Sequence, residues 1–206
     1  ERTVKENIKI SKFFSYKGND LTVEALDLLL SNISIGNLKG LGSKNIAILG
    51  TGNLGSKIAL KLIERGANVE IHRQNIKKLK SICIALNYIK PDSTEANLSY
   101  SKNIYTVCKN ADIIIGCTNG IPVIDNKIVS NSNKNLIIID VGKGTIKKEV
   151  LNSKNNNNNN IMIYRLDITA ALYGMLQSNI YFHKILSKNI GVSRYGNHRI
   201  ISGGIY

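Results

Sequence analysis

The sequence has few of the residues that build metal sites or disulfide frameworks, and it has no long apolar run. Its 206 residues include 3 cysteines, 2 prolines and no tryptophan. The cysteines are odd in number and lack a Cys-x-x-Cys spacing, so buried thiols are expected rather than a zinc site or disulfides. No apolar run approaches the ~18 residues of a membrane span, and no charged-then-apolar leader opens the chain. We therefore expect a cytoplasmic protein without a bound metal.

Acidic residues are also scarce. Only 14 Asp and Glu stand against 28 Lys and Arg, which gives a formal net charge of +14. Such a charge raises nucleic acid as a partner. The lysines are scattered, however, without a basic run or an aromatic-basic module, and Lys, Asn and Ile share AT-rich codons. We therefore expect no nucleic-acid partner, although a positive surface steers small anions inward.

A glycine-rich turn between two regular elements is the strongest functional signal. Residues 45–49 are an apolar run of the kind a buried parallel strand needs, and residues 54–63 repeat apolar positions at helical period. Between them stand three glycines at G-x-G-x-x-G spacing: Gly50, Gly52 and Gly55. The first strand, the glycine turn, the helix and a second strand at 68–73 together form one βαβ unit. Its length is close to the ~30 residues typical of dinucleotide-binding proteins. The pattern therefore predicts a bound dinucleotide rather than a merely structural turn.

Each part of this turn has a task in that interpretation. The first glycine allows the tight turn, the second lets a pyrophosphate approach the backbone, and the third lets the helix pack close to the strand. The amides at the start of the helix, at Asn53 and Leu54, then face the phosphates. The turn is therefore the predicted phosphate site.

The end of the second strand decides which dinucleotide is expected. An acidic residue there would hold the ribose 2′-hydroxyl of NAD, whereas an Arg accommodates the 2′-phosphate of NADP. Glu70 and Arg73 compete for this position. Because apolar character continues through Ile71, we place the strand end at His72 and leave Glu70 inside or below the crevice. NADP is therefore predicted over NAD, with contacts from His72, Arg73, Gln74 and Lys77.

Two later apolar runs end in small and polar residues. They read "ADIIIGCTNG" and "NLIIIDVGKG", and both predict buried parallel strands. Ligands of open α/β sheets gather at the carboxyl ends of the strands, so residues after both runs should border the same crevice. Turn chemistry is the alternative for all of them, and it is equally open for Asp140 and Lys143. The predicted cofactor contacts are Cys117, Thr118, Asn119, Val141 and Gly142.

The whole pattern predicts an α/β fold. Further helices are expected at 75–86, 102–110 and from 168 onward, with a further strand at 161–166 and a helix that begins near Asp20. Together these elements predict a doubly wound, mostly parallel sheet of the Rossmann type, with flanking N- and C-terminal helices. We assign 1–37 to an N-terminal segment and linking helix, 38–167 to the dinucleotide-binding domain, and 168–206 to the C-terminal helix and tail.

Three stretches give little sign of regular structure. Residues 88–101 are polar and irregular, and 153–160, "SKNNNNNN", predict a mobile loop. The stretch 191–206 has no clear period, so a truncated or poorly ordered end is expected. Because the chain starts with Glu1 rather than Met, we expect a processed product or part of a larger protein. Its partner would then be a domain absent from this chain or a second copy in a homodimer.

Residues 18–177 resemble the cofactor domain shared by shikimate dehydrogenases, glutamyl-tRNA reductases and methylenetetrahydrofolate dehydrogenases. Four pieces carry the resemblance: "GNDLTVEALDLLL", "GTGNLG", "HRQNIKK" and "ALYGMLQ". The glycine-rich turn is closer to the glutamyl-tRNA reductase form. "HRQNIKK" resembles the Asn-Arg-Thr-x-x-Lys loop of NADP-using shikimate dehydrogenases, which also implies NADP.

The resemblance implies roles for two further residues. In shikimate dehydrogenases an Asn-Thr-Asp motif opens the linking helix and supplies a catalytic Asp, and Asp20 after Asn19 is the nearest match. A late-helix Gln that touches substrate corresponds to Gln177. The family's Asn-Val-Thr-x-Pro-x-Lys motif is absent from the chain. The structural alternatives are a helix N-cap for Asp20 and an exposed polar position for Gln177.

Two functions of different classes follow. In the first, the chain is the cofactor domain of an NADP-dependent oxidoreductase that moves hydride to or from a small carbonyl, alcohol or imine substrate. In the second, it is a non-catalytic dinucleotide-binding module that serves or senses for another enzyme or domain.

Overall fold

A computed structural model describes residues 2–8, 10–11, 13–152, 160–189 and 191–202. The chain divides into two compact units. One consists of Thr22–Asp167 and is here called the sheet unit; the other joins Glu1–Leu21 to Ile168–Tyr206 and is called the terminal unit. The loop predicted at 153–160 lies outside the described residues except for its last position.

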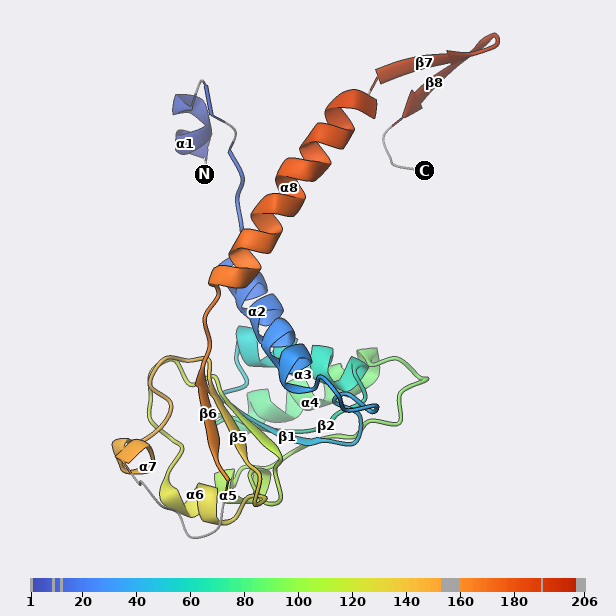
Figure 1. Ribbon diagram of the computed structural model, residues 1–206. Helices are drawn as coiled ribbons and strands as arrows, with labels where there is room; N and C mark the ends of the chain where they lie inside the picture. The colour runs from blue at the N-terminus through green and yellow to red at the C-terminus, as the bar shows by residue number, and fades with distance from the viewer. Residues whose placement is uncertain (1, 9, 12, 153–159, 190, 203–206) are drawn as a thin grey trace. The chain divides into compact units, whose positions relative to one another are not determined.

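The sheet unit is built on one six-stranded sheet with the order β3-β2-β1-β4-β5-β6 (Figure 1). Every neighbouring pair of strands is parallel. The strands are β1 (Asn45–Leu49), β2 (Asn68–His72), β3 (Leu98–Tyr100), β4 (Ile113–Gly116), β5 (Ile137–Asp140) and β6 (Met162–Arg165). This is the order of a doubly wound dinucleotide-binding sheet, in which the strand sequence reverses beside β1. The predicted fold class is confirmed.

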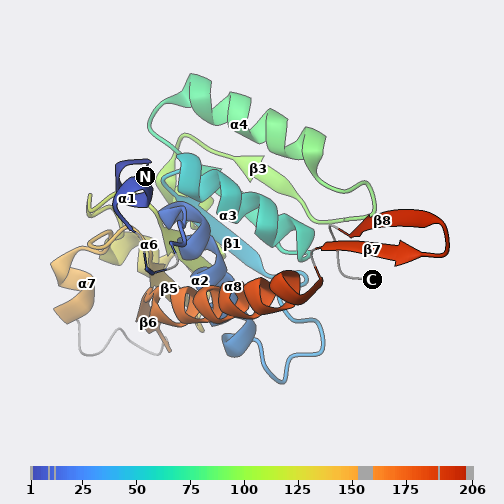
Figure 2. The ribbon, with the colours of Figure 1, turned by 90° about the horizontal axis from the view of Figure 1, so that it is seen from above.

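Helices cover both faces of this sheet. On one face α3 (Asn53–Glu64) and α4 (Ile76–Ile89) lie side by side (Figure 2). The part of α2 (Gly18–Ile33) that belongs to the sheet unit is tied to α3 by ion pairs of Lys61 with Glu24 and of Arg65 with Asp27. The other face carries the short helices α5 (Ile104–Val107), α6 (Asn126–Ser130) and α7 (Lys148–Asn152).

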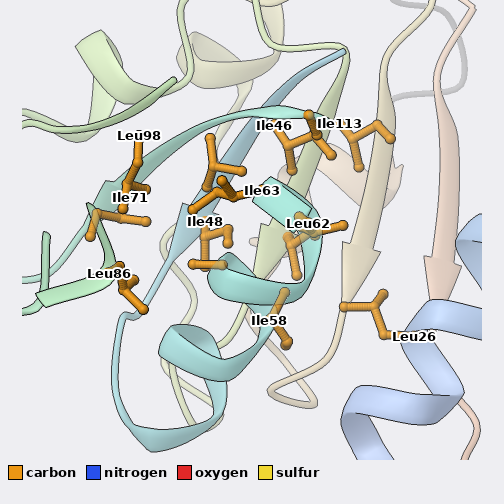
Figure 3. Close-up of a cluster of buried hydrophobic side chains, with 14 of the residues drawn as sticks. Leu26, Ile46, Ile48, Ile58, Leu62, Ile63, Ile71, Leu86, Leu98 and Ile113 are labelled. Atoms are coloured by element: carbon orange, nitrogen blue, oxygen red, sulfur yellow. The ribbon is translucent and has the colours of Figure 1, made fainter. Parts of the chain in front are cut away.

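Each face of the sheet has its own apolar core. Ile46 and Ile48 of β1 belong to the core on the α3 side, whereas Ala47 and Leu49 belong to the core on the opposite side. Figure 3 shows Ile48 beside side chains of α3 in the first of these cores. Because successive residues of a strand point to opposite faces and both faces are covered, a central strand can be apolar at successive positions, as at the three isoleucines that begin β4 and β5. This explains the unbroken isoleucine runs.

Two stretches that we expected to be irregular contain strands. Residues 88–101 include β3, which is only three residues long and partly polar, and it pairs Leu98 with Val69 of β2. The terminal unit holds α1 (Arg2–Asn7), α8 (Thr169–Asn189) and a hairpin of β7 (Gly191–Tyr195) with β8 (His198–Ser202). Gly196 has a φ of 58° in the hairpin turn, and Gly-Asn between two such runs is a hairpin signal that we overlooked. The expectation of a poorly ordered end is therefore wrong for 191–202.

No helix in the part of the chain that the structure describes is both long enough and apolar enough to cross a membrane.

We predict that Ile115→Ala lowers the free energy of unfolding by about 2–5 kcal/mol, because it removes buried surface and leaves a cavity. Ile115 is 0% exposed in β4. As a matched control, Ile84→Ala changes a side chain that is 59% exposed on α4, and its effect should stay within about 0.5 kcal/mol. Urea titrations followed by circular dichroism measure both variants. Equal losses would contradict the assignment of Ile115 to the core.

Candidate cofactor site

The glycine-rich turn lies at the carboxyl end of β1. Gly50 has a φ of 98°, and a Cβ placed there would lie 2.7 Å from the carbonyl carbon of Cys117. The loop after β4 therefore packs directly on the loop after β1. A Cβ on Gly55 would lie 2.5 Å from the carbonyl oxygen of Gly50, so the start of α3 is also in close contact with the turn. Both positions require glycine.

Gly52 is different, because nothing in its surroundings requires a glycine. It is the N-cap of α3 with a φ of −91°, and no atom lies within 4 Å of the place where its Cβ would stand. The Ser56 amide makes the first bond of the helix, donating to the Gly52 carbonyl at 3.0 Å. The earlier amides at Asn53, Leu54 and Gly55 stand at the positive end of the helix dipole. The space beside Gly52 is therefore suited to a phosphate.

Hydrogen bonds to the tip of β2 fix the shape of the turn. The His72 carbonyl accepts bonds from the amides of Gly50 (3.0 Å) and Thr51 (3.1 Å) and from the Thr51 hydroxyl (2.8 Å). Arg73 Nη1 donates to the Thr51 carbonyl at 2.7 Å. His72 Nδ1 lies 3.1 Å from the Ser101 carbonyl oxygen. These bonds hold the Arg73 guanidinium beside the turn and leave its other N–H groups available for further bonds.

A cavity of about 340 Å³ opens at this edge of the sheet. Its size is close to the lower end of small-molecule sites, which start at about 300 Å³. The predicted cofactor residues that line it are Gly50, Gly52, His72, Arg73, Gln74, Cys117 and Thr118. The structure thus brings the turn, the tip of β2 and the loop after β4 together, and the contacts of these residues with a cofactor stay predictions.

The lining also includes residues that we did not predict: Thr51, Asn75, Ile121 and Val123. Asn75 was detectable, because an Asn directly before a helical apolar pattern is a typical N-cap, and its side chain accepts the Lys78 amide at 3.0 Å. Thr51 was also detectable as the polar residue inside the glycine turn. Ile121 and Val123 gave no signal, because apolar loop residues look the same whether they line a cavity or a core.

The loop after β4 is closed by a turn of its own. Asn119 has a φ of 46°, and the Ile121 amide donates to the Thr118 carbonyl at 3.0 Å. The Thr118 hydroxyl donates to the Ile121 carbonyl at 2.6 Å. A Cβ on Gly142 would lie 3.0 Å from the amide nitrogens of Thr118 and Asn119. Asn119 and Gly142 therefore have turn and packing roles, and ligand contacts of Asn119, Val141 and Gly142 stay predictions.

Asp140 serves turn chemistry, which was one of its two open interpretations. Its carboxylate accepts the Gly144 amide (2.7 Å), the Thr145 amide (3.2 Å) and the Thr145 hydroxyl (2.8 Å). Lys143 belongs to the same turn, with a φ of 56°. Burial, and then the charge of Asp140, raise the pKa of the Cys117 thiol to about 12. Cys117 is therefore a neutral thiol at physiological pH rather than a nucleophile.

Glu70 does not reach this cavity. β2 ends at His72, as predicted, and Glu70 lies inside the strand. Its side chain lines a different cavity, together with Asn45 and Asn68, the first residues of β1 and β2. That cavity is at the opposite edge of the sheet, at the amino ends of β1 and β2. The predicted strand end at His72 is confirmed.

Asp20 and Gln177 belong to the terminal unit. α2 starts at Gly18, so Asp20 lies in the first helical turn, and the expectation that it is the N-cap is wrong. The side-chain amide of Gln177 donates to the Tyr173 hydroxyl at 3.0 Å, one turn earlier in α8, and Gln177 is exposed. The catalytic role of Asp20 and the substrate contact of Gln177 stay predictions.

Comparison with known proteins defines the class of this domain. Residues 45–144 match the family model described as NADP oxidoreductase, coenzyme F420-dependent. This range contains the glycine turn, the tip of β2 and the loops after β4 and β5. The sheet unit is therefore an NAD(P)-binding, oxidoreductase-like domain of the Rossmann type.

Two curated relatives are glutamyl-tRNA reductases, which confirms that resemblance. The protein of Thermosipho melanesiensis is 32% identical over 98 residues, covering 48% of this chain and 25% of that protein. The protein of Flavobacterium psychrophilum is 29% identical over 172 residues, covering 81% of this chain and 38% of that protein. The chain thus spans well under half the length of either relative.

Solved structures share the fold at low sequence identity. Dipicolinate synthase, A chain, from Bacillus subtilis is 16% identical with a TM-score of 0.52, covering 90% of this chain and 60% of that chain. An L-alanine dehydrogenase is 17% identical with a TM-score of 0.53, covering 82% of this chain and 54% of that chain. At such identities the likeness shows the Rossmann-like fold alone.

We predict that Gly52→Val abolishes dinucleotide binding and leaves the melting temperature close to that of the wild type. The open space at Gly52 accepts the side chain, which then fills the place of the phosphate. Gly50→Val is the contrasting variant, and it should destabilise the fold because of the positive φ and the Cys117 backbone. Calorimetric titration and thermal unfolding measure the two effects. Unchanged cofactor affinity in Gly52→Val would show that this turn is not the phosphate site.

Proposed function

We propose that this chain is the NADP(H)-binding domain of a reductase. The observation that carries the proposal is the open space at Gly52, bordered by the first amides of α3 and by the Arg73 guanidinium held at the tip of β2. No carboxylate is among the described residues that line this cavity. A ribose 2′-phosphate beside Arg73 would therefore meet a cation and no opposing negative charge.

The start of α4 supports the same choice of cofactor. Lys77 and Lys78 stand in its first turn, which contains no acidic residue. Cations at a helix N-terminus are unfavourable, because that end already carries a partial positive charge. An anion bound between Arg73 and this turn offsets the repulsion. The 2′-phosphate of NADP supplies such an anion, and NAD does not.

The cofactor would supply hydride transfer at C4 of its nicotinamide. The part of this chain would be to bind and orient the reactants, with a carbonyl, alcohol or imine carbon held at the crevice. We propose Asp20 as the general acid or base and Gln177 as a substrate contact. The two relatives named glutamyl-tRNA reductase make glutamyl-tRNA the first substrate to test.

A second candidate is a non-catalytic dinucleotide-binding module. It is favoured by the titratable side chains of the cavity: among the described residues these are His72, Arg73 and Cys117. The pKa of Cys117, at about 12, keeps its thiol neutral. Among the described residues that line the cavity, His72 is then the one side chain of a type commonly used for general acid–base catalysis.

The oxidation of NADPH by a set of substrates separates the two candidates. The longest native gene product is mixed with NADPH and either glutamyl-tRNA or a panel of keto acids and imines, or with NADP⁺ and a panel of hydroxy acids, and the absorbance of NADPH is followed. The reductase proposal predicts turnover with at least one substrate, and Asp20→Asn should reduce it by about 10²-fold or more without lowering the melting temperature. Tight NADPH binding without any turnover would favour the binding module.

We predict that Arg73→Ala weakens NADPH binding by about 1.5–3 kcal/mol, the range for hydrogen bonds to charged groups. NADH affinity should change much less, because NADH lacks the 2′-phosphate. In the wild type, NADPH should bind more tightly than NADH, and this preference should shrink as salt is added, since it depends on charge. Calorimetric titrations at two ionic strengths measure these affinities.

The matched control is Arg65→Ala, which removes the same charge at the C-cap of α3, the end of that helix far from the turn. It should leave the ratio of the two affinities unchanged. Equal affinities for NADPH and NADH in the wild type would contradict the proposal. So would a preference for NADH that Glu70→Gln abolishes, because Glu70 would then hold the ribose.

A further inference from the structure

A second cavity lies at the opposite edge of the sheet, at the amino ends of the strands. Its volume is about 340 Å³, similar to that of the cofactor cavity. Four asparagines contribute to its lining, together with one acidic and one basic residue: Asn45, Asn68, Asn97, Asn110, Glu70 and Lys109. The candidate function described above uses none of these residues. An apolar parallel sheet therefore carries a polar cavity at the edge where no ligand is expected.

The two carboxylates near this edge have different surroundings. Asp112 accepts the Asn45 amide at 2.9 Å and the side-chain amide of Asn133 at 2.7 Å. Glu70 projects from the middle of β2, and the described residues provide it with no hydrogen bond or ion pair. Burial raises the pKa of the Glu70 carboxyl, which reflects the cost of holding its charge without a partner. Glu70 is thus the polar group of this edge that a ligand would satisfy.

The cavity also contains a basic residue, but that residue does not neutralise Glu70. Lys109 lines the cavity, and no ion pair joins it to Glu70 or to another described carboxylate. The separated charges instead leave a carboxylate and an ammonium that line the same open cavity, with asparagine residues around them.

We propose that this cavity is a binding site for a small zwitterion, namely a free α-amino acid with a polar side chain. The ammonium of such a ligand would pair with Glu70 and its carboxylate with Lys109, so that both charges of the wall are satisfied at once. The asparagine amides would hydrogen-bond its side chain. A simple cation would pair only with Glu70, and a simple anion only with Lys109. A zwitterion pairs with both residues, so it should bind more tightly than a ligand with one charge.

The site is joined to the cofactor turn through one strand. Glu70 lies two residues before His72, whose carbonyl anchors the turn at Gly50 and Thr51. The proposal does not depend on the identity of the cofactor or on catalysis. It is therefore tested on the unmodified full chain by ligand binding alone.

The test is a titration of the ¹⁵N-labelled chain with L-serine, L-asparagine and L-glutamine, followed by amide chemical shifts. We expect saturable shifts at the amides of Asn45, Asn68 and Ala111 for at least one amino acid, with a Kd of about 1 mM or tighter. Methylammonium and acetate, the two halves of the ligand, should bind at least about tenfold more weakly. The amides of the glycine turn report whether the cofactor cavity is occupied instead.

Glu70→Gln and Lys109→Gln should each weaken binding at least about tenfold, because each leaves one ligand charge unpaired. Glu70→Gln is nearly isosteric and Lys109→Gln changes an exposed side chain, and the circular dichroism spectrum and melting temperature confirm that each variant is folded. Glu64→Gln and Lys134→Gln are matched controls at exposed positions outside the cavity lining, and they should bind as the wild type does.

Three results would overturn the proposal. The first is the lack of saturable shifts at these amides at concentrations well above about 1 mM. The second is equal affinity for an amino acid and for methylammonium or acetate. The third is unchanged affinity in both Glu70→Gln and Lys109→Gln.

Discussion

The arrangement of the cofactor cavity depends on the carbonyl oxygen of His72. This oxygen accepts the amides of Gly50 and Thr51 and the Thr51 hydroxyl, so the last residue of one strand holds the loop that follows its neighbour. Thr51 is 0% exposed, and its own carbonyl is bound by Arg73. A buried polar residue with unsatisfied groups would be costly, so the turn has one favoured shape. That shape keeps the space at Gly52 open and sets the guanidinium beside it.

The same anchoring separates two kinds of glycine within one motif. Gly50 and Gly55 are needed by the protein itself, since a Cβ at either position would collide with backbone atoms of Cys117 or of the turn. Gly52 meets no such obstacle. The fold requires glycine at the first and third positions of the motif but not at the second. A ligand that needs the space at the second position best explains the glycine there. This contrast supports a phosphate site more strongly than the glycine spacing does.

The sheet was predictable because its main strands are short apolar runs that alternate along the chain with helical periods. β1 was expected at 45–49 and spans Asn45–Leu49, and the end of β2 at His72 followed from the limit of its apolar pattern. The lining of the cavity was predictable where it follows from the motif, as at Gly52 and Arg73, whose contacts with a cofactor stay predictions. The site was not predictable where one side chain chooses among several partners: nothing in the sequence shows that Asp140 bonds Gly144 and Thr145. Nor does it show that Glu70 and Lys109 share a cavity, because that depends on the pleat and on strand order.

The isoleucine runs of β4 and β5 carry a risk during synthesis. β4 lies between β1 and β5 in the sheet, yet β1 is made long before it, so β1 has an unpaired edge until β4 has emerged. Consecutive buried β-branched residues are prone to pair with other chains in that interval, and parallel pairing between distant segments is slow. Charged residues flank both runs closely: Asp112 precedes β4, Lys134 stands shortly before β5, and Asp140 ends it. Asp112 and Asp140 also accept hydrogen bonds from backbone amides, whereas Lys134 is exposed. Replacing Lys134 with an apolar residue is therefore expected to lower the yield of folded chain at synthesis more than its final stability.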